Sequence, residues 1–390
     1  MSDRRVVVIG AGPAGLASAA ELGRRGVAAE VLDRADAVGS SWRGRYDRLR
    51  LNSSRPFSKL PRGRFARGTG MFPSRQEVVA YLEHYARRHE LDVRFGVQVE
   101  RIAWNGGWVV ETSAGDVRAE HVIVATGFEH TPFLPGWPGR ERFDGQLMHA
   151  AEYRNPEPFG GDDVLVVGPG CSGMEIAYDL AEGGARRVRL AVRTAPNMIV
   201  RAPAGPLFAN ALLKLPPRRA DALMRFIRRR EIGDLAEFGL PVPEEGVFSR
   251  LRRLNVAPAI VDMEVVQAIR DRRIEIVGAV DSFDETGVEL AGGTRIEPDA
   301  VIAATGYRTG LKPLVGHLDV LDERGVPRGR PGDEVAPGLR FVGFLPRPAH
   351  LGQMGREGKR AAKGIALATT RSSSRRVGTR KRVRDLAARA

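Results

Sequence analysis

The sequence predicts an α/β protein with two parallel sheets, one of them in a domain inserted within the other. The main observation is a pattern used twice: a short β-branched strand, a glycine-rich turn and a helix. It appears as RVVVIGAGPAGLASAAELGRRG and, about 160 residues later, as DVLVVGPGCSGMEIAYDLAEGG. Two further strands end alike, as VIVATGF at 122–128 and VIAATGY at 301–307. We therefore expect two Rossmann-like dinucleotide-binding domains of the three-layer ββα type.

The two strands that end alike also indicate where the chain changes domain. It should cross into the second domain near Phe133, return near Gly310, and complete the first domain with a strand at 339–343 and a helix from about Gly355. The expected parts are the first domain at 1–135 and 310–370, the inserted domain at 136–309, and a basic disordered tail at 371–390.

The first glycine-rich turn, GAGPAG, is typical of a dinucleotide site. Gly10 permits the tight turn, Gly12 lets a pyrophosphate approach the backbone, and Gly15 lets the helix lie close to the strand. The helix N-terminus supplies free N–H groups to the phosphates. Asp33 lies 18 residues after Gly15, near where an acid that binds a ribose is expected.

The second turn carries Gly168, Gly170 and Gly173, but its following strand ends in Arg193 and Thr194 instead of an acid. A guanidinium can bind a 2′-phosphate bidentately, whereas an acid would repel it. The second site is therefore predicted to prefer NADPH over NADH. An acidic first site and a basic second site together predict FAD plus NADPH, with FAD in the first domain and NADPH in the inserted one.

Composition excludes several other classes. The chain has 390 residues and one cysteine, Cys171, so neither a CxxC redox pair nor a thiolate metal site can form, and no metal is expected. We interpret Cys171 as a small buried thiol in a reducing compartment. The net charge is +14, but residues 371–390 hold eight bases and one acid, so half of it lies in the tail (8 − 1 = +7). Specific nucleic-acid binding is not expected.

Hydropathy predicts a cytoplasmic protein. The chain enters its first buried strand directly after Arg5, which leaves no room for a signal peptide, and no apolar run is long enough to span a bilayer. A region near 203–253 is expected to form a helical cap over an active site. Residues 203–230 within it mix apolar and arginine-rich turns, so weak contact with a membrane surface is the alternative.

The segment between the two domains carries a family fingerprint. FDGQLMHAAEYR resembles FxGxxxHxxx(Y/F)(K/R) of the flavin-containing monooxygenases, with its five fixed positions at Phe143, Gly145, His149, Tyr153 and Arg154 and the second glycine turn following. Tyr153 and Arg154 depart from the related motif of Baeyer–Villiger monooxygenases. Other stretches that resemble the plant YUCCA-like branch include SSWRGRYDRLRLNSS, FPSRQEVVAYLEHYA, CSGMEIAYDL, DLAEFGLPVP, PAIVD and AATGY.

This resemblance implies an FAD- and NADPH-dependent monooxygenase that forms a flavin C4a-(hydro)peroxide and transfers one oxygen atom from O2 to a small organic substrate. YUCCA-like enzymes oxidatively decarboxylate indole-3-pyruvate, and other members oxygenate soft nitrogen or sulfur atoms. Where plant members read LHLPK, this chain has Leu51-Asn52-Ser53-Ser54, which is closer to general members. The motifs therefore leave the substrate open, and the oligomeric state as well.

The resemblance also implies residue roles. Asn52 should hydrogen-bond the flavin or its oxygen adduct, while His149, Tyr153 and Arg154 should fix the linker and NADP⁺ without transferring protons. The expected FAD contacts are Gly10, Gly12, Pro13, Ala14, Gly15, Asp33, Arg34, Ser41, Trp42, Leu51, Asn52, Thr126, Gly127, Gly343 and Gln353. The expected NADP contacts are Gly168, Gly170, Cys171, Ser172, Gly173, Arg193, Thr194, Thr305, Gly306 and Tyr307.

Two other interpretations use the same nucleotide sites. One is an NADPH-dependent flavin reductase or oxidase that passes electrons to a partner or to O2. The other is a non-catalytic, NADPH-sensing flavoprotein that acts through its basic tail. The fingerprint favours oxygenation over both.

Overall fold

The computed structural model describes residues 3–254, 256–345, 348 and 350–387. Its first sheet has the strand order β19-β20-β6-β1-β2-β3, and a β4–β5 hairpin extends from β6. The neighbours from β20 to β3 are parallel, as the repeated strand–turn–helix pattern predicts. The strands are β1 (Asp3–Ile9), β2 (Glu30–Leu32), β3 (Val93–Arg94), β4 (Val99–Trp104), β5 (Trp108–Thr112), β6 (Val117–Val124), β19 (Glu334–Ala336) and β20 (Leu339–Phe341).

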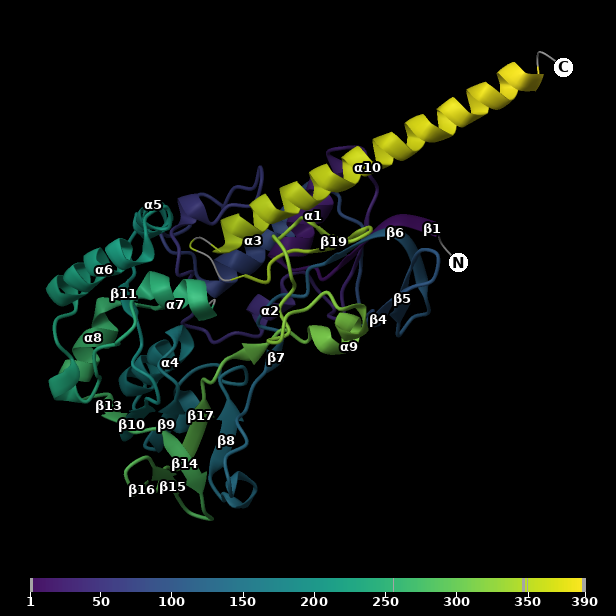
Figure 1. Ribbon diagram of the computed structural model, residues 1–390. Coiled ribbons are helices and arrows are strands. Elements are labelled where there is room, and N and C mark those ends of the chain that lie inside the picture. The colour runs from purple at the N-terminus through teal and green to yellow at the C-terminus, as the bar shows by residue number, and fades with distance from the viewer. Residues whose placement is uncertain (1–2, 255, 346–347, 349, 388–390) are drawn as a thin grey trace.

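Side chains of this sheet alternate between two apolar layers. Val6 and Val8 of β1 pack with the helices on one face, whereas Val7 and Ile9 pack with the β4–β5 hairpin and a short helix on the other. Figure 1 shows α1 and α10 side by side over the sheet. The helices of this part are α1 (Pro13–Gly23), α2 (Ser40–Arg43), α3 (Arg75–Arg88), α9 (Leu311–Val315) and α10 (His350–Ala387). The three-layer ββα arrangement is confirmed here.

The second sheet repeats the arrangement, with the order β13-β10-β9-β17-β8 and parallel pairing throughout. A three-stranded antiparallel sheet, β14-β15-β16, covers one face, and α4 and α8 cover the other. The elements are β8 (Gln146–His149), β9 (Asp163–Val167), α4 (Cys171–Glu182), β10 (Arg187–Ala191), α8 (Met263–Arg270), β13 (Glu275–Val277), β14 (Val280–Phe283), β15 (Val288–Leu290), β16 (Thr294–Ile296) and β17 (Ala300–Ala303).

Two short strands join the halves of the molecule. β7 (Thr131–Pro132) leaves the first sheet, and β18 (Tyr307–Arg308) returns toward it. They pair antiparallel, with Tyr307 opposite Pro132 and Arg308 opposite Thr131. The outgoing and returning linkers therefore run side by side, which keeps the two sheets next to each other (Figure 1).

A helical region is inserted after β10 of the second sheet, between β11 (Met198–Val200) and β12 (Ala259–Val261), which pair in parallel. It contains α5 (Gly205–Leu212), α6 (Pro217–Glu231) and α7 (Val247–Leu254). Leu212, Ala220, Met224, Val247 and Phe248 form its own small apolar core. These helices occupy the region in which the sequence predicts a cap.

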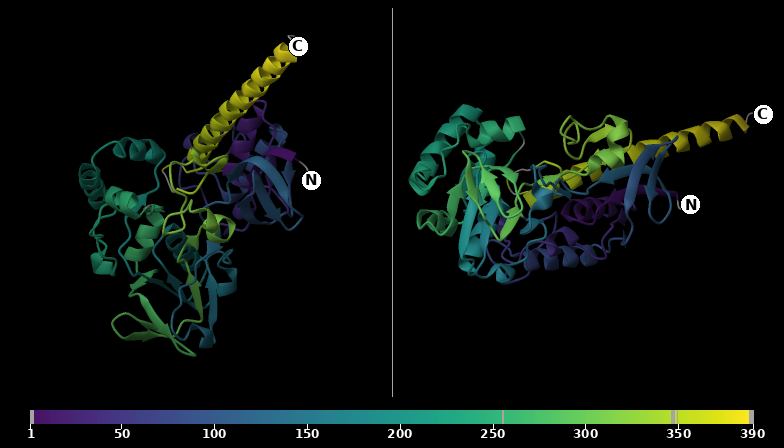
Figure 2. Two further views of the ribbon diagram at one scale, coloured as in Figure 1. Left: turned by 45° about the vertical axis from the view of Figure 1, so that its right-hand side comes forward. Right: turned by 90° about the horizontal axis from the view of Figure 1, so that it is seen from below.

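The C-terminal helix departs from expectation at both ends. α10 begins at His350, not near Gly355, and it continues to Ala387, where the sequence predicts a disordered tail from 371. Segment 371–387 has six arginines and one lysine, which are good helix formers, and no proline that would end the helix. Figures 1 and 2 show this helix projecting away from the sheets. Residues 388–390 lie outside the described part. Among the described helices, none is long and apolar enough to cross a membrane.

Candidate active site

The first glycine-rich turn is shaped by steric limits that only glycine meets. Gly10 has φ +106°, and a Cβ there would lie 2.7 Å from the carbonyl oxygen of Ala125. A Cβ on Gly15 would lie 1.8 Å from the carbonyl oxygen of Gly10, so this glycine lets α1 approach β1. A Cβ on Gly12 would meet nothing within 4 Å. Gly12 therefore leaves open space at the start of α1.

The second turn has the same geometry. Gly168 has φ +113°, and its Cβ would lie 2.6 Å from the Ala304 carbonyl oxygen, while a Cβ on Gly173 would lie 1.8 Å from the Gly168 carbonyl oxygen. Gly170, like Gly12, faces open space. Gly12 and Gly170 are the N-caps of α1 and α4, and neither helix receives a side-chain cap. Both helices thus present uncapped N–H groups to an anion such as a pyrophosphate.

Several residues expected to contact FAD lie around the first turn. The Asp33 carboxylate accepts hydrogen bonds from the Ala11 N–H at 2.5 Å and the Ala35 N–H at 2.8 Å. A Cβ on Gly343 would lie 3.0 Å from Cβ of Ala14, so the strand end beyond β20 also touches α1. The loop from Arg34 to Trp42 returns to the turn, since the Gly39 N–H donates to the Ala11 carbonyl oxygen at 3.5 Å.

A buried polar atom at this site has no hydrogen-bond partner. Thr126 Oγ1 follows Ala125, whose carbonyl oxygen lies under Gly10, and it is buried without a partner. Buried polar groups are normally satisfied, so such an atom suits a polar ligand. Together with the open space at Gly12, it makes this turn a fit for FAD, which Thr126, Gly127 and the turn would hold.

The carboxyl end of the second sheet offers a cationic edge. Arg193 and Thr194 are exposed just beyond β10, one strand away from the turn that follows β9. An exposed guanidinium at this position fits the 2′-phosphate of NADPH. On the far side of the turn, Thr305 donates a hydrogen bond through Oγ1 to the Phe133 carbonyl oxygen, which ties the segment that follows β17 to the outgoing linker. Ser172 is half-buried at the start of α4.

The fingerprint residues divide into two groups. Phe143 packs edge-on against Phe283, and a Cβ on Gly145 would lie 2.5 Å from the Phe143 ring, so these two shape the packing under the antiparallel sheet. The other three lie at the junction of the two halves. Tyr153 donates through its hydroxyl to Asp179 of α4 at 2.8 Å, and burial raises its pKa, which keeps the hydroxyl protonated. The Arg154 carbonyl oxygen accepts from the Asp47 N–H at 2.8 Å.

His149 is held as a neutral ring. Its Nδ1 accepts from the Ala151 N–H at 3.0 Å, so the proton lies on Nε2, which donates to the Gly306 carbonyl oxygen at 3.0 Å. Burial lowers the pKa of His149. The ring lies edge-on to Tyr307, whose hydroxyl accepts from Arg45 at 2.5 Å. His149 thus ties the end of β8 to the returning linker, in keeping with a positioning role.

Asn52 belongs to a polar network that links the two halves. Its Oδ1 accepts from Nη2 of Arg201 at 3.3 Å. Arg201 is buried and also donates to Glu175 of α4 at 2.8 Å, with a further ion pair to Asp262 at 3.3 Å. The second carboxylate oxygen of Glu175 accepts from the Tyr46 hydroxyl at 2.5 Å. The segment that carries Asn52 is therefore fixed to the helix that follows the second turn.

The single thiol, Cys171, is poorly suited to redox chemistry. Its sulfur accepts from the Ile260 N–H at 3.2 Å and donates to the Pro258 carbonyl oxygen at 3.6 Å. Burial raises the pKa of Cys171 to about 11, so the thiolate is scarce at neutral pH. Its place at the first residue of α4 leaves its backbone N–H for a phosphate.

Comparison with known proteins identifies the family of this chain. The model of a family described as pyridine nucleotide-disulphide oxidoreductases matches residues 7–203. The indole-3-pyruvate monooxygenase YUCCA1 of Oryza sativa subsp. japonica is 38% identical over 359 residues, which cover 87% of this chain and 86% of the relative. YUCCA4 of the same plant is 35% identical over 364 residues, covering 87% and 83%. The chain belongs to the flavin-containing monooxygenase family.

Solved structures agree with this family. A double variant of the flavin monooxygenase from Stenotrophomonas maltophilia matches with a TM-score of 0.73 and 25% identity, over 95% of this chain and 100% of that one. Cyclohexanone monooxygenase matches with a TM-score of 0.73 at 18% identity, over 95% and 88% of the chains, which is a likeness of fold alone. The protein is an FAD- and NADPH-dependent monooxygenase, and neither the reductase nor the sensor interpretation is favoured.

Four residues of this monooxygenase were missed by sequence reasoning: Tyr46, Glu175, Arg201 and His350. Tyr46 and Arg201 are in loops, and nothing in their local pattern shows that they meet at Glu175. His350 is the first residue of α10, lies edge-on to Phe128, and has both ring nitrogens buried without partners. Phe128, the contact of His350, follows Thr126 and Gly127, which the sequence assigns to FAD, but the contact itself joins residues far apart in the chain.

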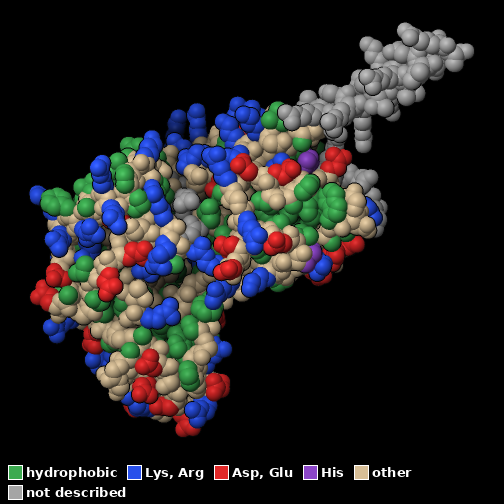
Figure 3. All heavy atoms as spheres, viewed as in Figure 1, with side chains coloured by type: hydrophobic (Ala, Val, Ile, Leu, Met, Phe, Trp, Pro, Cys, Tyr) green, Lys and Arg blue, Asp and Glu red, His purple; other side chains and the backbone are tan. Residues whose placement is uncertain are grey.

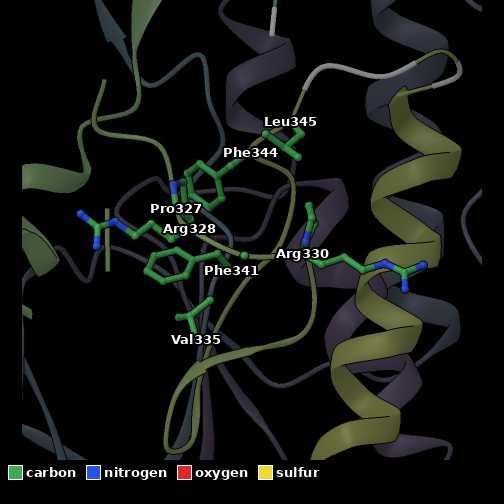
Figure 4. A pocket seen from close by; sticks show the side chains of 9 residues that line it. Pro327, Arg328, Arg330, Val335, Phe341, Phe344 and Leu345 are labelled. Carbon is green, nitrogen blue, oxygen red and sulfur yellow. The ribbon is translucent and has the colours of Figure 1, made fainter. Parts of the chain in front are cut away.

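A small pocket elsewhere is not the active site. It lies between 327–331 and β20, and Figure 4 shows Phe341, Phe344 and Val335 facing into it while Arg328 and Arg330 point away. Apolar walls without converging polar groups give it no chemistry. In the described residues, no group of three His, Cys, Asp or Glu side chains could hold a metal ion.

Proposed function

We propose that this monooxygenase acts in the cytoplasm on an aromatic 2-oxo acid of the indole-3-pyruvate class and converts it to the acid one carbon shorter. The relatives that share 38% and 35% of their aligned residues with this chain are named indole-3-pyruvate monooxygenases. The substrate class rests on this relationship, and the site of oxygen transfer between the two nucleotide sites rests on the place of Asn52. It follows Leu51, which packs in the same apolar cluster as Ala11 and Ala14 of the first turn, and it bonds to Arg201, which binds the helix of the second turn.

In this proposal residues 1–135 and 310–370 bind FAD, and residues 136–309 bind NADPH. When bound, FAD would supply the redox chemistry that takes electrons from NADPH to O2. The first turn, Asp33, Thr126 and the start of α10 hold FAD, while the second turn and Arg193 hold NADPH. Asn52 has its Oδ1 engaged by Arg201, so its amide N–H groups are left to donate toward FAD or the oxygen bound there. The helical cap excludes water.

The overall reaction balances as one 2-oxo acid, one O2, one NADPH and one proton giving the shortened carboxylic acid, CO2, water and NADP⁺. The bond between the keto carbon and the carboxylate breaks, and one oxygen atom of O2 joins the former keto carbon. The other oxygen atom leaves as water, and NADPH supplies the two electrons. No metal or second protein is required.

The test is turnover of indole-3-pyruvate by the purified holoenzyme with NADPH and O2, with the product acid measured by mass spectrometry. Catalase must be present, because H2O2 from an uncoupled enzyme would itself decarboxylate a 2-oxo acid in solution. We expect one acid per NADPH with catalase added. Loss of the product on adding catalase would refute the proposal, and coupled turnover of amines or sulfides alone would indicate N- or S-oxygenation instead.

A further inference from the structure

The outer face of the helical cap carries an unusual surface. Of the twelve large apolar side chains that are strongly exposed in the described residues, five lie between 207 and 226. They are Leu207, Phe208, Leu215, Leu223 and Phe226, and Phe226 is 64% exposed. Single exposed apolar residues are ordinary, but a cluster of this kind marks an interaction site. We call these five residues and the cations among them the cap surface.

Incomplete packing of the cap does not explain this exposure. The inner side of α5 and α6 buries Leu212, Ala220 and Met224 against α7, which completes a small core. Asp221 is also buried, where its carboxylate accepts from the N–H of Phe248 at 2.7 Å. The two helices therefore already have a satisfied inner side, and the exposed residues form a second, outward side.

The charge of the cap surface is predominantly positive. From residue 202 to the end of α6 at Glu231, the exposed charged residues are six cations, Lys214, Arg218, Arg219, Arg225, Arg229 and Arg230, and one acid, Glu231. The other acid of this range, Asp221, is buried. Figure 3 shows apolar and basic side chains intermingled at this end of the molecule. Apolar side chains surrounded by cations match a bilayer whose headgroups are anionic, because the apolar groups enter the acyl boundary while the cations meet the headgroups.

Other partners fit less well. A nucleic acid would use the cations, but it would leave five large apolar side chains without a role. A second copy of the chain would bring six cations against six, which opposes pairing. We propose that the cap surface docks this enzyme on anionic lipid membranes. The inference goes beyond the proposed function and does not depend on the substrate.

The cap surface begins next to the active site. The Ser54 hydroxyl donates to the Pro203 carbonyl oxygen at 2.6 Å, two residues from Asn52 and four from Leu207. Arg201, which holds Asn52, is two residues before Pro203. A membrane bound at the cap surface would therefore lie close to the segment that carries Asn52.

The experiment is sedimentation of the full-length holoenzyme with vesicles of phosphatidylcholine alone or with about one third phosphatidylserine. We expect binding to the anionic vesicles, and a partition coefficient at least about tenfold lower for Leu207→Ser/Phe226→Ser. The matched control is Phe95→Ser/Leu367→Ser, which removes two exposed apolar side chains elsewhere and should bind like the parent enzyme. FAD content and thermal unfolding report whether each variant is folded.

Four results would overturn the proposal. The first is the absence of binding to anionic vesicles. The second is equal loss of binding in the test and control variants. The third is binding that survives Leu207→Ser/Phe226→Ser but vanishes when residues 371–390 are deleted, which would mean that the tail binds the membrane. The fourth is a salt-sensitive complex with duplex DNA, or a dimer in analytical ultracentrifugation, that is lost in Leu207→Ser/Phe226→Ser. Either would show that the cap surface binds a partner other than lipid.

Discussion

The side chain of Asn52 illustrates how much a single residue depends on distant partners. An arginine only donates hydrogen bonds, so its contact at 3.3 Å identifies the oxygen of the Asn52 amide and thereby the direction of its N–H groups. Arg201 is itself fixed between Glu175 and Asp262. Its planar guanidinium reaches these three partners from two nitrogens in a fixed geometry, which a lysine ammonium does not reproduce.

Replacing this arginine should therefore uncouple the enzyme without unfolding it. Arg201→Lys keeps the charge beside Glu175 but loses the fork, so the Asn52 amide is no longer oriented. We expect H2O2 release per NADPH to rise several-fold, while the rate of anaerobic flavin reduction by NADPH stays within about twofold. Asn52→Ala should give the same uncoupling. Tight coupling in both variants would show that Asn52 has no such role.

A second residue-scale prediction concerns cofactor choice. Arg193→Ala removes the exposed guanidinium expected at the 2′-phosphate, a charge-assisted contact worth about 1.5–3 kcal/mol. The KM for NADPH should rise about 10- to 100-fold, whereas the KM for NADH, which lacks that phosphate, should hardly change. Steady-state kinetics with both nucleotides measures the difference. An equal change for NADPH and NADH would place the 2′-phosphate elsewhere.

At the scale of elements, the two strand–turn–helix units were predictable because their signals are local. Gly15 and Gly173 each face the carbonyl oxygen of the glycine five residues earlier, so their steric roles are local. Gly10 and Gly168 face Ala125 and Ala304, which are distant in the chain, but the spacing of the motif was enough to assign them to the turns. The Asn52–Arg201 contact spans 149 residues and Tyr46–Glu175 spans 129, so no pattern in the chain reports them. The length of α10 was missed because a polar, charged segment resembles disorder, although its arginines and lysine are good helix formers.

The two glycines of the second turn should respond differently to the same substitution. Gly173→Ala places a Cβ 1.8 Å from the Gly168 carbonyl oxygen, so α4 must shift, at a cost of about 3 kcal/mol in the free energy of unfolding. Gly170→Ala meets no protein atom, so stability should fall by less than about 1 kcal/mol while NADPH binding weakens. Thermal unfolding and NADPH titration separate the two. Equal effects on stability would contradict this geometry.

At the scale of the whole molecule, buried histidines should make stability depend on pH. Burial lowers the pKa of His350 to about 4. The unfolded chain binds this proton near the ordinary value of about 6.5, so acidification favours unfolding between about pH 6.5 and 4. From pH 6.5 to 5 this one residue should cost about 2 kcal/mol. His89, His130 and His149 also have pKa values lowered by burial, so they act in the same direction.

The corresponding variant is His350→Gln, which cannot take up that proton. Its melting temperature should fall less steeply between pH 7 and 5 than that of the parent holoenzyme. Calorimetry at matched ionic strength measures both slopes. Identical slopes would mean that His350 is not buried as a neutral ring in the folded protein.

The central claim also concerns the whole molecule: both nucleotide sites cooperate to transfer one atom of O2 to an organic substrate. The most direct measurement is turnover of indole-3-pyruvate under 18O2 with NADPH and catalase. We predict one 18O atom in each molecule of shortened acid and one NADPH consumed per product. Product acid without 18O, or NADPH oxidation matched by H2O2 measured without catalase, would contradict the claim.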